Sequence, residues 1–425
     1  MHNITDLNIT KEILPLFDYT YNDFAKQVLI QLLNNIPNNL GDVLYRQKII
    51  IGCNSNWEIL HSFSYSKIDL NEVYQYLKKL ESDNTIVQGH KLRVKLFLSE
   101  KEKYRTQARL TQLIHLFHRI NSLYLSRIKL DAFPLIFQEK LKNMYDFLNS
   151  FNLIKYNQVI EEKGLKLSHI VELVALINDK IKNDEIVSFW KDFFLFEAYI
   201  SIATGIQKNQ FTFPIFQENI FSLTEFYHPL LKKPITNNLS FNNNIVLITG
   251  PNMSGKSTLL KAISLCVYLG HLGLGVPAVE CRIPFFNIIS VAINLSDDLK
   301  NGYSHFMTEI MNLKKVALQA RASQKCFAVF DELFRGTNID DALELTEKTI
   351  YGLSKFKGSF FIISTHLYQL RDTEEISKNK VSSFYLDCSI NNKSPNFSYH
   401  LKNGWSNLKI GKILFEKEGL DEILK

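Results

Sequence analysis

The 425-residue sequence lacks the features that mark a secreted or membrane protein. Its N-terminus has no basic segment followed by an apolar one, so we expect no signal peptide. No apolar run is long enough to cross a bilayer. The cysteines are few, odd in number and widely spaced, at Cys53, Cys266, Cys281, Cys326 and Cys388. No pair has the spacing of a zinc site or a redox motif, so we expect a reduced, cytoplasmic protein without a membrane partner.

Strong charge bias is also absent, since the formal net charge is only +6. The basic residues nevertheless gather between residues 91 and 129, where the sequence has ten Lys or Arg and only two acidic residues, Glu100 and Glu102. The ten are Lys91, Arg93, Lys95, Lys101, Lys103, Arg105, Arg109, Arg119, Arg127 and Lys129. Two interpretations stay open: a basic helical arm that meets DNA phosphates, or an ordinary solvated helix face.

Glycine is scarce up to about residue 205, and apolar residues there recur at helical spacing. The segment 108–125 is an example. Its stripe consists of Leu110, Leu113, Ile114, Phe117, Ile120 and Tyr124. This pattern is typical of amphipathic helices. We therefore predict an all-α core or lever domain over residues 1–205.

The second half has a different pattern. Short apolar runs, "NIVLITG", "KCFAVFDE" and "SFFIISTH", read as buried strands, and helical segments separate them. Such alternation predicts an α/β domain with a mostly parallel sheet. We place this domain at residues 206–425.

A glycine-bearing loop follows the first of these strands. Residues 250–257 fit the pattern G-x-x-x-x-G-K-[ST], with a strand before and a helix after. Backbone N–H groups of such a loop surround phosphates, the lysine reaches the β and γ oxygens, and the hydroxyl holds Mg²⁺. The pattern predicts ATP bound by Gly250, Pro251, Asn252, Met253, Ser254, Gly255, Lys256, Ser257 and Thr258, with Ser257 as a Mg²⁺ ligand. A strand-to-helix turn that binds nothing is the alternative.

Polar residues at two further strand ends complete a candidate ATPase site. Asp331 and Glu332 follow the apolar run that begins at Cys326. We expect Asp331 to hold Mg²⁺ through water, and Glu332 to orient or deprotonate the attacking water. His366 follows "FFIIST" and is placed to contact the γ-phosphate. Lys256, Glu332 and His366 are thus the predicted catalytic side chains of the chain itself.

Taken together, these motifs resemble the MutS family of DNA mismatch-repair ATPases. "LITGPNMSGKST" is similar to the family's loop, with Ser254 where glycine is usual. "SDDLKNGYSHFMTEI" resembles a motif between the two ATP motifs, in which Ser304 and Glu309 match. "DELFRGTN" resembles a third, with Phe334 in place of glycine. The ATPase resemblance covers about residues 220–423, and the helical resemblance is fainter.

The resemblance implies a P-loop ATPase of the ABC-superfamily type that works as a homodimer, at least with ATP. Ser304 would reach the γ-phosphate of the partner's site in trans. ATP would close the pair as a clamp on duplex or branched DNA, in mismatch repair or recombination. Full-length relatives carry a Phe-x-Glu mismatch wedge in an N-terminal domain. Phe137-Gln-Glu139 and Phe216-Gln-Glu218 match that tripeptide in other regions, so we expect no such wedge here.

Two other classes of function remain as alternatives. A transporter ATPase would need an L-S-G-G-Q-like signature before the acidic strand, where this chain has "DDLKNGYSHF". An ABC-type ATP switch acting on a protein partner would need no DNA contact. A damaged acidic site would favour a non-catalytic switch, yet Asp331 and Glu332 are both present.

Overall fold

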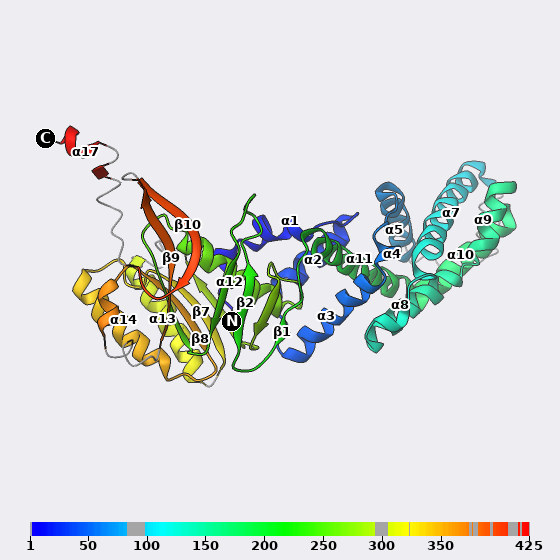
Figure 1. Ribbon diagram of the computed structural model, residues 1–425. Helices are drawn as coiled ribbons and strands as arrows, with labels where there is room; N and C mark the ends of the chain where they lie inside the picture. The colour runs from blue at the N-terminus through cyan, green and yellow to red at the C-terminus, as the bar shows by residue number, and fades with distance from the viewer. Residues whose placement is uncertain are drawn as a thin grey trace. The chain divides into compact units, whose positions relative to one another are not determined.

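The computed structural model describes residues 2–82, 98–293, 305–322, 324–373, 376, 381–391, 394–406, 415–416 and 419–424. The chain forms two compact units (Figure 1). The α/β unit comprises Met1–Leu16, Leu33–Leu44 and Lys208–Lys425, and the helical unit comprises Phe17–Leu32 and Tyr45–Gln207. The chain passes from one unit to the other inside α1 (Leu14–Phe17), α2 (Asp23–Asn34), α3 (Leu40–Ser55) and α11 (Glu185–Asn209).

The helical unit confirms the helical interpretation of the first half. Its remaining α-helices are α4 (Trp57–Leu60), α5 (Lys67–Ser82), α7 (Glu100–Ile120), α8 (Leu135–Asn149), α9 (Leu153–Glu162) and α10 (Leu167–Lys182). None of the helices among the described residues is long and apolar enough to span a membrane.

Helix α7 shows why these segments fold as they do. The Ser99 hydroxyl caps its start by accepting from the Glu102 backbone N–H at 3.4 Å. Acidic residues occupy the first turn and His118 and Arg119 the last, which suits the helix dipole. All six residues of the predicted apolar stripe are buried, the last of them, Tyr124, in the π-helical turn Asn121–Leu125. Burial of this stripe fixes the helix within its unit.

A six-stranded sheet forms the centre of the α/β unit. Its order is β10-β9-β4-β8-β7-β6, and all neighbours are parallel except the pair β9 and β10. The strands are β4 (Ile245–Thr249), β6 (Ile288–Ala292), β7 (Cys326–Asp331), β8 (Phe360–Thr365), β9 (Ser382–Asn391) and β10 (Ser394–Asn403). The three predicted strands, β4, β7 and β8, are confirmed and lie next to one another.

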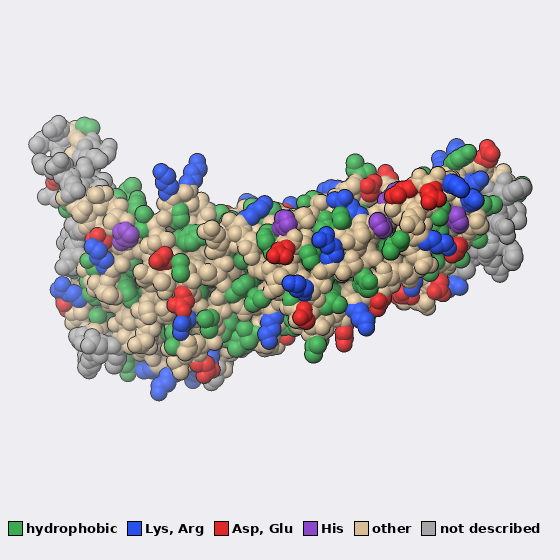
Figure 2. Space-filling view, turned by 45° about the vertical axis from the view of Figure 1, so that its right-hand side comes forward, with side chains coloured by type: hydrophobic (Ala, Val, Ile, Leu, Met, Phe, Trp, Pro, Cys, Tyr) green, Lys and Arg blue, Asp and Glu red, His purple; other side chains and the backbone are tan. Residues whose placement is uncertain are grey.

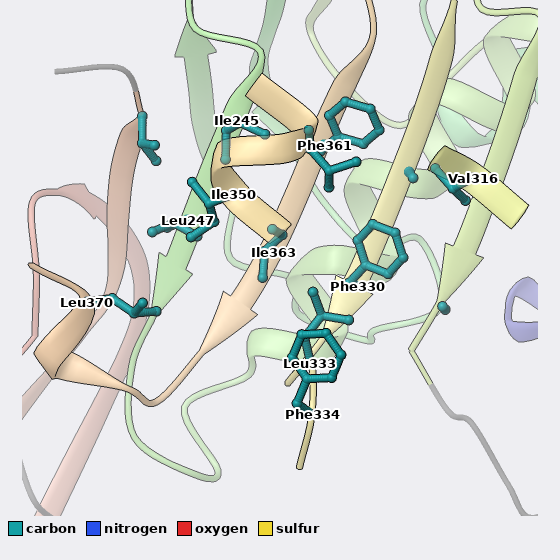
Figure 3. Packing of buried hydrophobic residues seen from close by; sticks show 14 of the residues in the cluster. Ile245, Leu247, Val316, Phe330, Leu333, Phe334, Ile350, Phe361, Ile363 and Leu370 are labelled. Carbon is teal, nitrogen blue, oxygen red and sulfur yellow. The ribbon is translucent and has the colours of Figure 1, made fainter. Parts of the chain in front are cut away.

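Helices cover this sheet because its central strands are apolar on both faces. Alternate residues of β4, β7 and β8 pack with α13 (His305–Arg321) and α14 (Ile339–Ser354) in one buried cluster (Figure 3). The intervening residues of these strands are buried as well. Helix α12 (Lys256–His271) follows β4 and is itself almost wholly buried. A parallel sheet covered on both faces presents only its edges and strand ends to solvent, and a site is expected there.

The sequence did not predict a second, four-stranded sheet in the same unit. Its order is β1-β5-β2-β3, formed by β1 (Ile215–Phe216), β5 (Glu280–Ile283), β2 (Phe221–Phe226) and β3 (Asn237–Phe241). The shorter elements are the 3₁₀ turns Thr5–Leu7, Leu130–Ala132 and Tyr368–Asp372, the π turn Ile9–Ile13, and α17 (Leu420–Ile423).

The N-terminal residues extend the edge of the large sheet. Asn3 forms a parallel bridge with Ser290 of β6, and the Asp6 carboxylate accepts from the Ile293 N–H at 2.7 Å. Residues 1–16 and 33–44 therefore group with the α/β unit, although the sequence pattern assigned them to the helical part. The domain boundary between residues 205 and 206 falls inside α11 and stays a prediction.

Candidate active site

The loop between β4 and α12 turns sharply at the carboxyl end of the sheet. Gly250 has φ 152° and Gly255 has φ 93°, values that favour glycine. Gly255 is also the N-cap of α12. The loop thus ends at a helix N-terminus, where free N–H groups and the helix dipole favour an anion.

Lys256 lies inside this loop and is 6% exposed. Its Nζ donates to the carbonyl oxygens of Gly250 at 2.8 Å and Pro251 at 3.2 Å, and lies 3.5 Å from Glu332 Oε1. A buried ammonium needs such partners to offset its desolvation. The lysine therefore connects the loop after β4 to the acidic end of β7.

Ser257 and Asp331 meet across one intervening strand. The Ser257 hydroxyl donates to Asp331 Oδ2 at 2.5 Å. Strand β8 lies between β4 and β7, and Ser364 of β8 is the register partner of Asp331. The Ser364 hydroxyl donates to Asp331 Oδ1, so a small polar side chain on β8 both makes room for the carboxylate and holds it. Hydroxyl and carboxylate oxygens are the hard donors that Mg²⁺ prefers.

Glu332 faces Lys256, Arg335 and His366. His366 Nδ1 lies 3.9 Å and Lys256 Nζ 3.5 Å from its Oε1, and Arg335 Nη1 lies 3.7 Å from its Oε2. His366 contributes most to lowering the pKa of Glu332 to about 2, and Lys256 and Arg335 add to it against the opposing effect of burial. Glu332 is therefore ionised at neutral pH.

A pocket of about 370 Å³ opens beside the loop. Aromatic and apolar side chains of β2, of the segment after it and of β10 form much of its wall, together with Ser254, Gly255 and Thr258. A Cβ on Gly255 would lie 3.2 Å from the Tyr399 ring, so glycine is needed for this close approach. Two buried atoms of the lining, Ser254 Oγ and His228 Nδ1, have no hydrogen-bond partner among the described residues. An apolar pocket with a few unsatisfied polar atoms suits a small-molecule ligand.

The structure brings most of the predicted site residues to one edge of the sheet. The loop residues 250–258 lie beside Asp331 and Glu332, and His366 approaches Glu332. Asn252 and Met253 are exposed at the loop's tip, and Thr258 lines the pocket. Ser304 lies outside the described residues, and its predicted role stays a prediction. In the described part of the chain, no three His, Cys, Asp or Glu side chains are grouped to hold a metal.

Sequence reasoning missed three parts of the site. Ser364 lies in the run "FFIIST" before His366, but the sequence indicated no role for it, although its hydroxyl holds Asp331. His228 and Tyr399 line the same pocket from distant positions in the sequence. Tyr399 is identified only by its close packing against Gly255, and no local sequence pattern predicts that contact.

The cations expected to form a DNA-binding arm are partly used inside the helical unit. Arg119 donates through Nε to the Ser64 carbonyl oxygen at 3.0 Å, and Arg109 lies over the Tyr76 ring. Figure 2 shows basic and acidic side chains mixed over the face in view. Lys91, Arg93 and Lys95 lie outside the described residues. The DNA-binding arm therefore stays a prediction.

The fold and the site together define a class: an α/β protein with a glycine-rich loop and an acidic strand end at the carboxyl edge of a mostly parallel sheet. Residues 246–420 match the family model described as MutS domain V. The chain is 31% identical over 214 residues to the DNA mismatch repair protein MutS of Bacillus velezensis, covering 48% of this chain and 25% of that protein. It is 30% identical over 226 residues to MutS of a Geobacillus species, covering 51% and 26%.

Over this domain the chain is therefore similar to the MutS family. The match spans about a quarter of the length of these curated relatives. The resemblance stated from the motifs is confirmed, as is the order of a helical region followed by a mixed α/β domain.

Proposed function

We propose that the α/β unit is a P-loop ATPase of the ABC-superfamily type, which converts ATP and water to ADP and phosphate. The observation that carries this proposal is the 2.5 Å contact between Ser257 Oγ and Asp331 Oδ2. It joins the phosphate-binding loop to the acidic strand end, the two parts that such a site needs. The names of the relatives add support, since they are DNA mismatch repair proteins.

The residues present fit Mg²⁺ and a nucleotide. Ser257 and Asp331 supply oxygen ligands, and Mg²⁺ bound there would neutralise charge on the phosphate oxygens. The loop from Gly250 to Thr258 would hold the phosphates, with Lys256 exchanging its carbonyl partners for phosphate oxygens. The pocket beside it would take the base, where the Ser254 hydroxyl and the His228 nitrogen can bond to its polar atoms.

Glu332 would act on the attacking water. Its pKa of about 2 keeps it ionised and makes it a poor proton acceptor, which favours orienting the water through a hydrogen bond. Once Lys256 turns to phosphate, Glu332 loses one of the cations that lower its pKa, and it becomes more basic. His366, exposed over about half of its side chain, would contact the γ-phosphate from the end of β8.

ATP binding and hydrolysis by the purified chain test this proposal. A fluorescent ATP analogue is titrated with and without Mg²⁺, and phosphate release is followed in parallel. We expect Mg²⁺-dependent binding and turnover, and loss of both in Asp331→Asn, with Asp340→Asn on the first turn of α14 as the control. Absence of nucleotide binding by the wild-type chain would overturn the proposed ATPase.

We further propose that the chain acts on DNA as an ATP-driven clamp, in mismatch repair or in the processing of branched DNA. Two copies would close on DNA, at least with ATP, and Ser304 of one copy would serve the site of the other. Residues 1–205 would form the core and lever domain, and 206–425 the ATPase domain. Phe137 is 1% exposed inside the helical unit, so it is not available as a mismatch wedge.

A binding titration tests the DNA proposal separately. Perfect duplex, a G·T mismatch, a four-way junction and single strands are each titrated with ADP, with ATP and without nucleotide, at fixed salt. We expect a preference for one structure that ATP changes. Hydrolysis without binding to any of these would instead favour an ATP switch that acts on a protein partner.

The basic arm has its own test within the DNA proposal. Lys101→Glu combined with Arg105→Glu should weaken binding to all sequences and lower the slope of log affinity against log salt by about 0.9 for each phosphate that the arm no longer neutralises. Lys348→Glu on α14 is the control, because Lys348 pairs with Glu344 on the surface of the other unit. An unchanged salt slope in the double variant would show that DNA binds elsewhere.

A further inference from the structure

The backbone that carries Glu332 adopts an unusual conformation. Glu332 has φ 54° and Phe334 has φ 63°, and both are non-glycine residues in the left-handed region. Such residues persist there only where the surrounding structure holds them, because a side chain makes this conformation unfavourable. The turn after β7 therefore needs contacts that fix it, and they determine where the Glu332 carboxylate points.

Strand β8 holds the first residue of the turn. The Glu332 N–H donates to the Ser364 carbonyl oxygen at 3.1 Å and approaches the Ser364 hydroxyl at 3.2 Å. Ser364 also donates to Asp331. The beginning of the turn is thus held by the same residue that positions the predicted metal ligand.

Helix α13 holds the other side of the turn through Glu309. Glu309 is 3% exposed, and its Oε2 accepts from the Phe334 N–H at 2.8 Å. A buried N–H in a left-handed turn has no strand partner of its own, so this carboxylate replaces the missing acceptor.

The first turn of α13 adds two apolar contacts. The Phe306 and Phe334 rings meet edge to face, with centroids 6.2 Å apart. A Cβ on Gly336 would lie 2.9 Å from Phe306 Cβ, so only glycine allows the chain to pass this closely. Leu333 and Phe334 are buried beyond the end of β7, as Figure 3 shows. Helix α13 and the turn therefore pack together, and Glu309 adds a polar contact between them.

We propose that Glu309 is a positioning residue for Glu332, acting through the Phe334 N–H. This inference rests on the proposed ATPase function. Glu309 fixes the turn at one end and β8 fixes it at the other, so the Glu332 carboxylate is held where it meets Lys256 and His366. Loss of the Glu309 acceptor should free the turn while leaving the loop from Gly250 to Ser257 intact.

Glu309→Met tests this because it keeps the length of the side chain and removes the acceptor, whereas Glu309→Gln keeps an acceptor oxygen. In the full chain with ATP and Mg²⁺, we expect kcat to fall by about tenfold or more in Glu309→Met, since small displacements of a reacting group are costly. KM and the Kd for ATP should stay within about twofold of the wild-type values, because the substrate-binding loop is untouched. Glu309→Gln should restore kcat to within about threefold.

Hydrogen exchange gives a readout that needs no nucleotide. The Phe334 amide should exchange about tenfold faster or more in Glu309→Met than in the wild type, and slowly in Glu309→Gln. Glu344→Ala on α14 is the matched control, because Glu344 is exposed and pairs with Lys348 at the surface of the same unit. If the methionine variant does not fold, Glu309→Ala serves in its place.

Three results separate the possible failures. Fast exchange at Phe334 with an unchanged kcat would overturn the positioning role. Equal losses of kcat and ATP affinity in the methionine and glutamine variants would show general disruption, and would overturn it too. A wild-type chain that binds but never hydrolyses ATP would overturn the proposed function itself, before any variant is compared.

Discussion

Two carboxylates, the partly buried Glu332 and the buried Glu197, have pKa values shifted in opposite directions. Glu332 of the α/β unit faces His366, Lys256 and Arg335, and its pKa is lowered to about 2. Glu197 of the helical unit is 1% exposed, and burial raises its pKa to about 7. The same side chain is thus a stable anion in one unit and close to half-protonated at neutral pH in the other.

The partners of Glu197 explain the difference. Its Oε1 accepts from the Tyr21 N–H at 2.6 Å, and its Oε2 from Asn22 Nδ2 at 2.9 Å and from the Tyr65 hydroxyl. These neutral donors tie the start of α2 to α11 and lower the pKa less than burial raises it. The surroundings of Glu332 therefore suit the role in catalysis that we propose for it, whereas the neutral donors around Glu197 suit a structural role.

Among the variants that test this comparison, Lys256→Ala should have the largest effect, because it removes a cation beside Glu332 and the proposed ligand for phosphate. We expect kcat/KM for ATP to fall by about 10³-fold. The pKa of Glu332 should rise, and carboxyl carbon NMR measures that change. Lys348→Ala, on the surface of α14, is the control and should leave both quantities unchanged. Hydrolysis at the wild-type rate in Lys256→Ala would show that the cation beside Glu332 is not needed for hydrolysis.

Glu197→Gln should change stability and not catalysis. Because its folded pKa lies above the ordinary value of 4.5, wild-type Glu197 stabilises the fold most below pH 4.5. That contribution is lost as the pH rises through about 7, by on the order of 3 kcal/mol. Glutamine has no proton to lose. The free energy of unfolding of Glu197→Gln, measured by hydrogen exchange of the α11 amides, should therefore not fall over this pH range. If the free energy of unfolding of the variant fell as steeply with pH as that of the wild type, Glu197 would not be the cause of this pH dependence.

Ser257→Ala should have a smaller effect on the Glu332 site, because it leaves Lys256, Arg335 and His366 in place. We expect the Mg²⁺ concentration for half-maximal hydrolysis to rise by about 10- to 100-fold. A Ser257→Thr variant keeps the hydroxyl and should behave like the wild type. An unchanged Mg²⁺ requirement in the alanine variant would mean that Ser257 is not a ligand.

Tyr65→Phe should have the smallest effect. It removes one neutral donor from Glu197 and leaves those of Tyr21 and Asn22. The free energy of unfolding of the helical unit should fall by about 1–2 kcal/mol, and the pKa of Glu197 should rise further. Tyr104→Phe, at an exposed tyrosine of α7, is the control. ATP hydrolysis should be unchanged in both variants.

The locally encoded parts of the structure were predictable. The apolar runs before Gly250, Asp331 and His366 each form a buried parallel strand, and the glycine loop occupies the predicted position. The amphipathic stripe of α7 is buried as its spacing requires. These features depend on neighbours within a few residues, so periodicity and turn chemistry suffice to find them.

The remaining parts depend on contacts between distant segments. Asn3 joins the edge of the sheet at Ser290, and Glu309 of α13 reaches Phe334 in the turn after β7. Tyr399 packs on Gly255 from a strand bulge near the end of the chain. No local pattern carries this information, because each contact exists only once the strand order is set. The roles of the site residues themselves remain predictions that experiment must test.

A single-turnover measurement on Glu332→Gln tests the central claim most directly. Wild-type chain and variant are mixed with ATP and Mg²⁺, passed rapidly through a gel-filtration column, and the bound nucleotide is identified. We predict that the variant retains unhydrolysed ATP and that its rate falls by about 10²- to 10⁴-fold, while its affinity for ATP stays near that of the wild type. Hydrolysis by Glu332→Gln at the wild-type rate would contradict the account of this site.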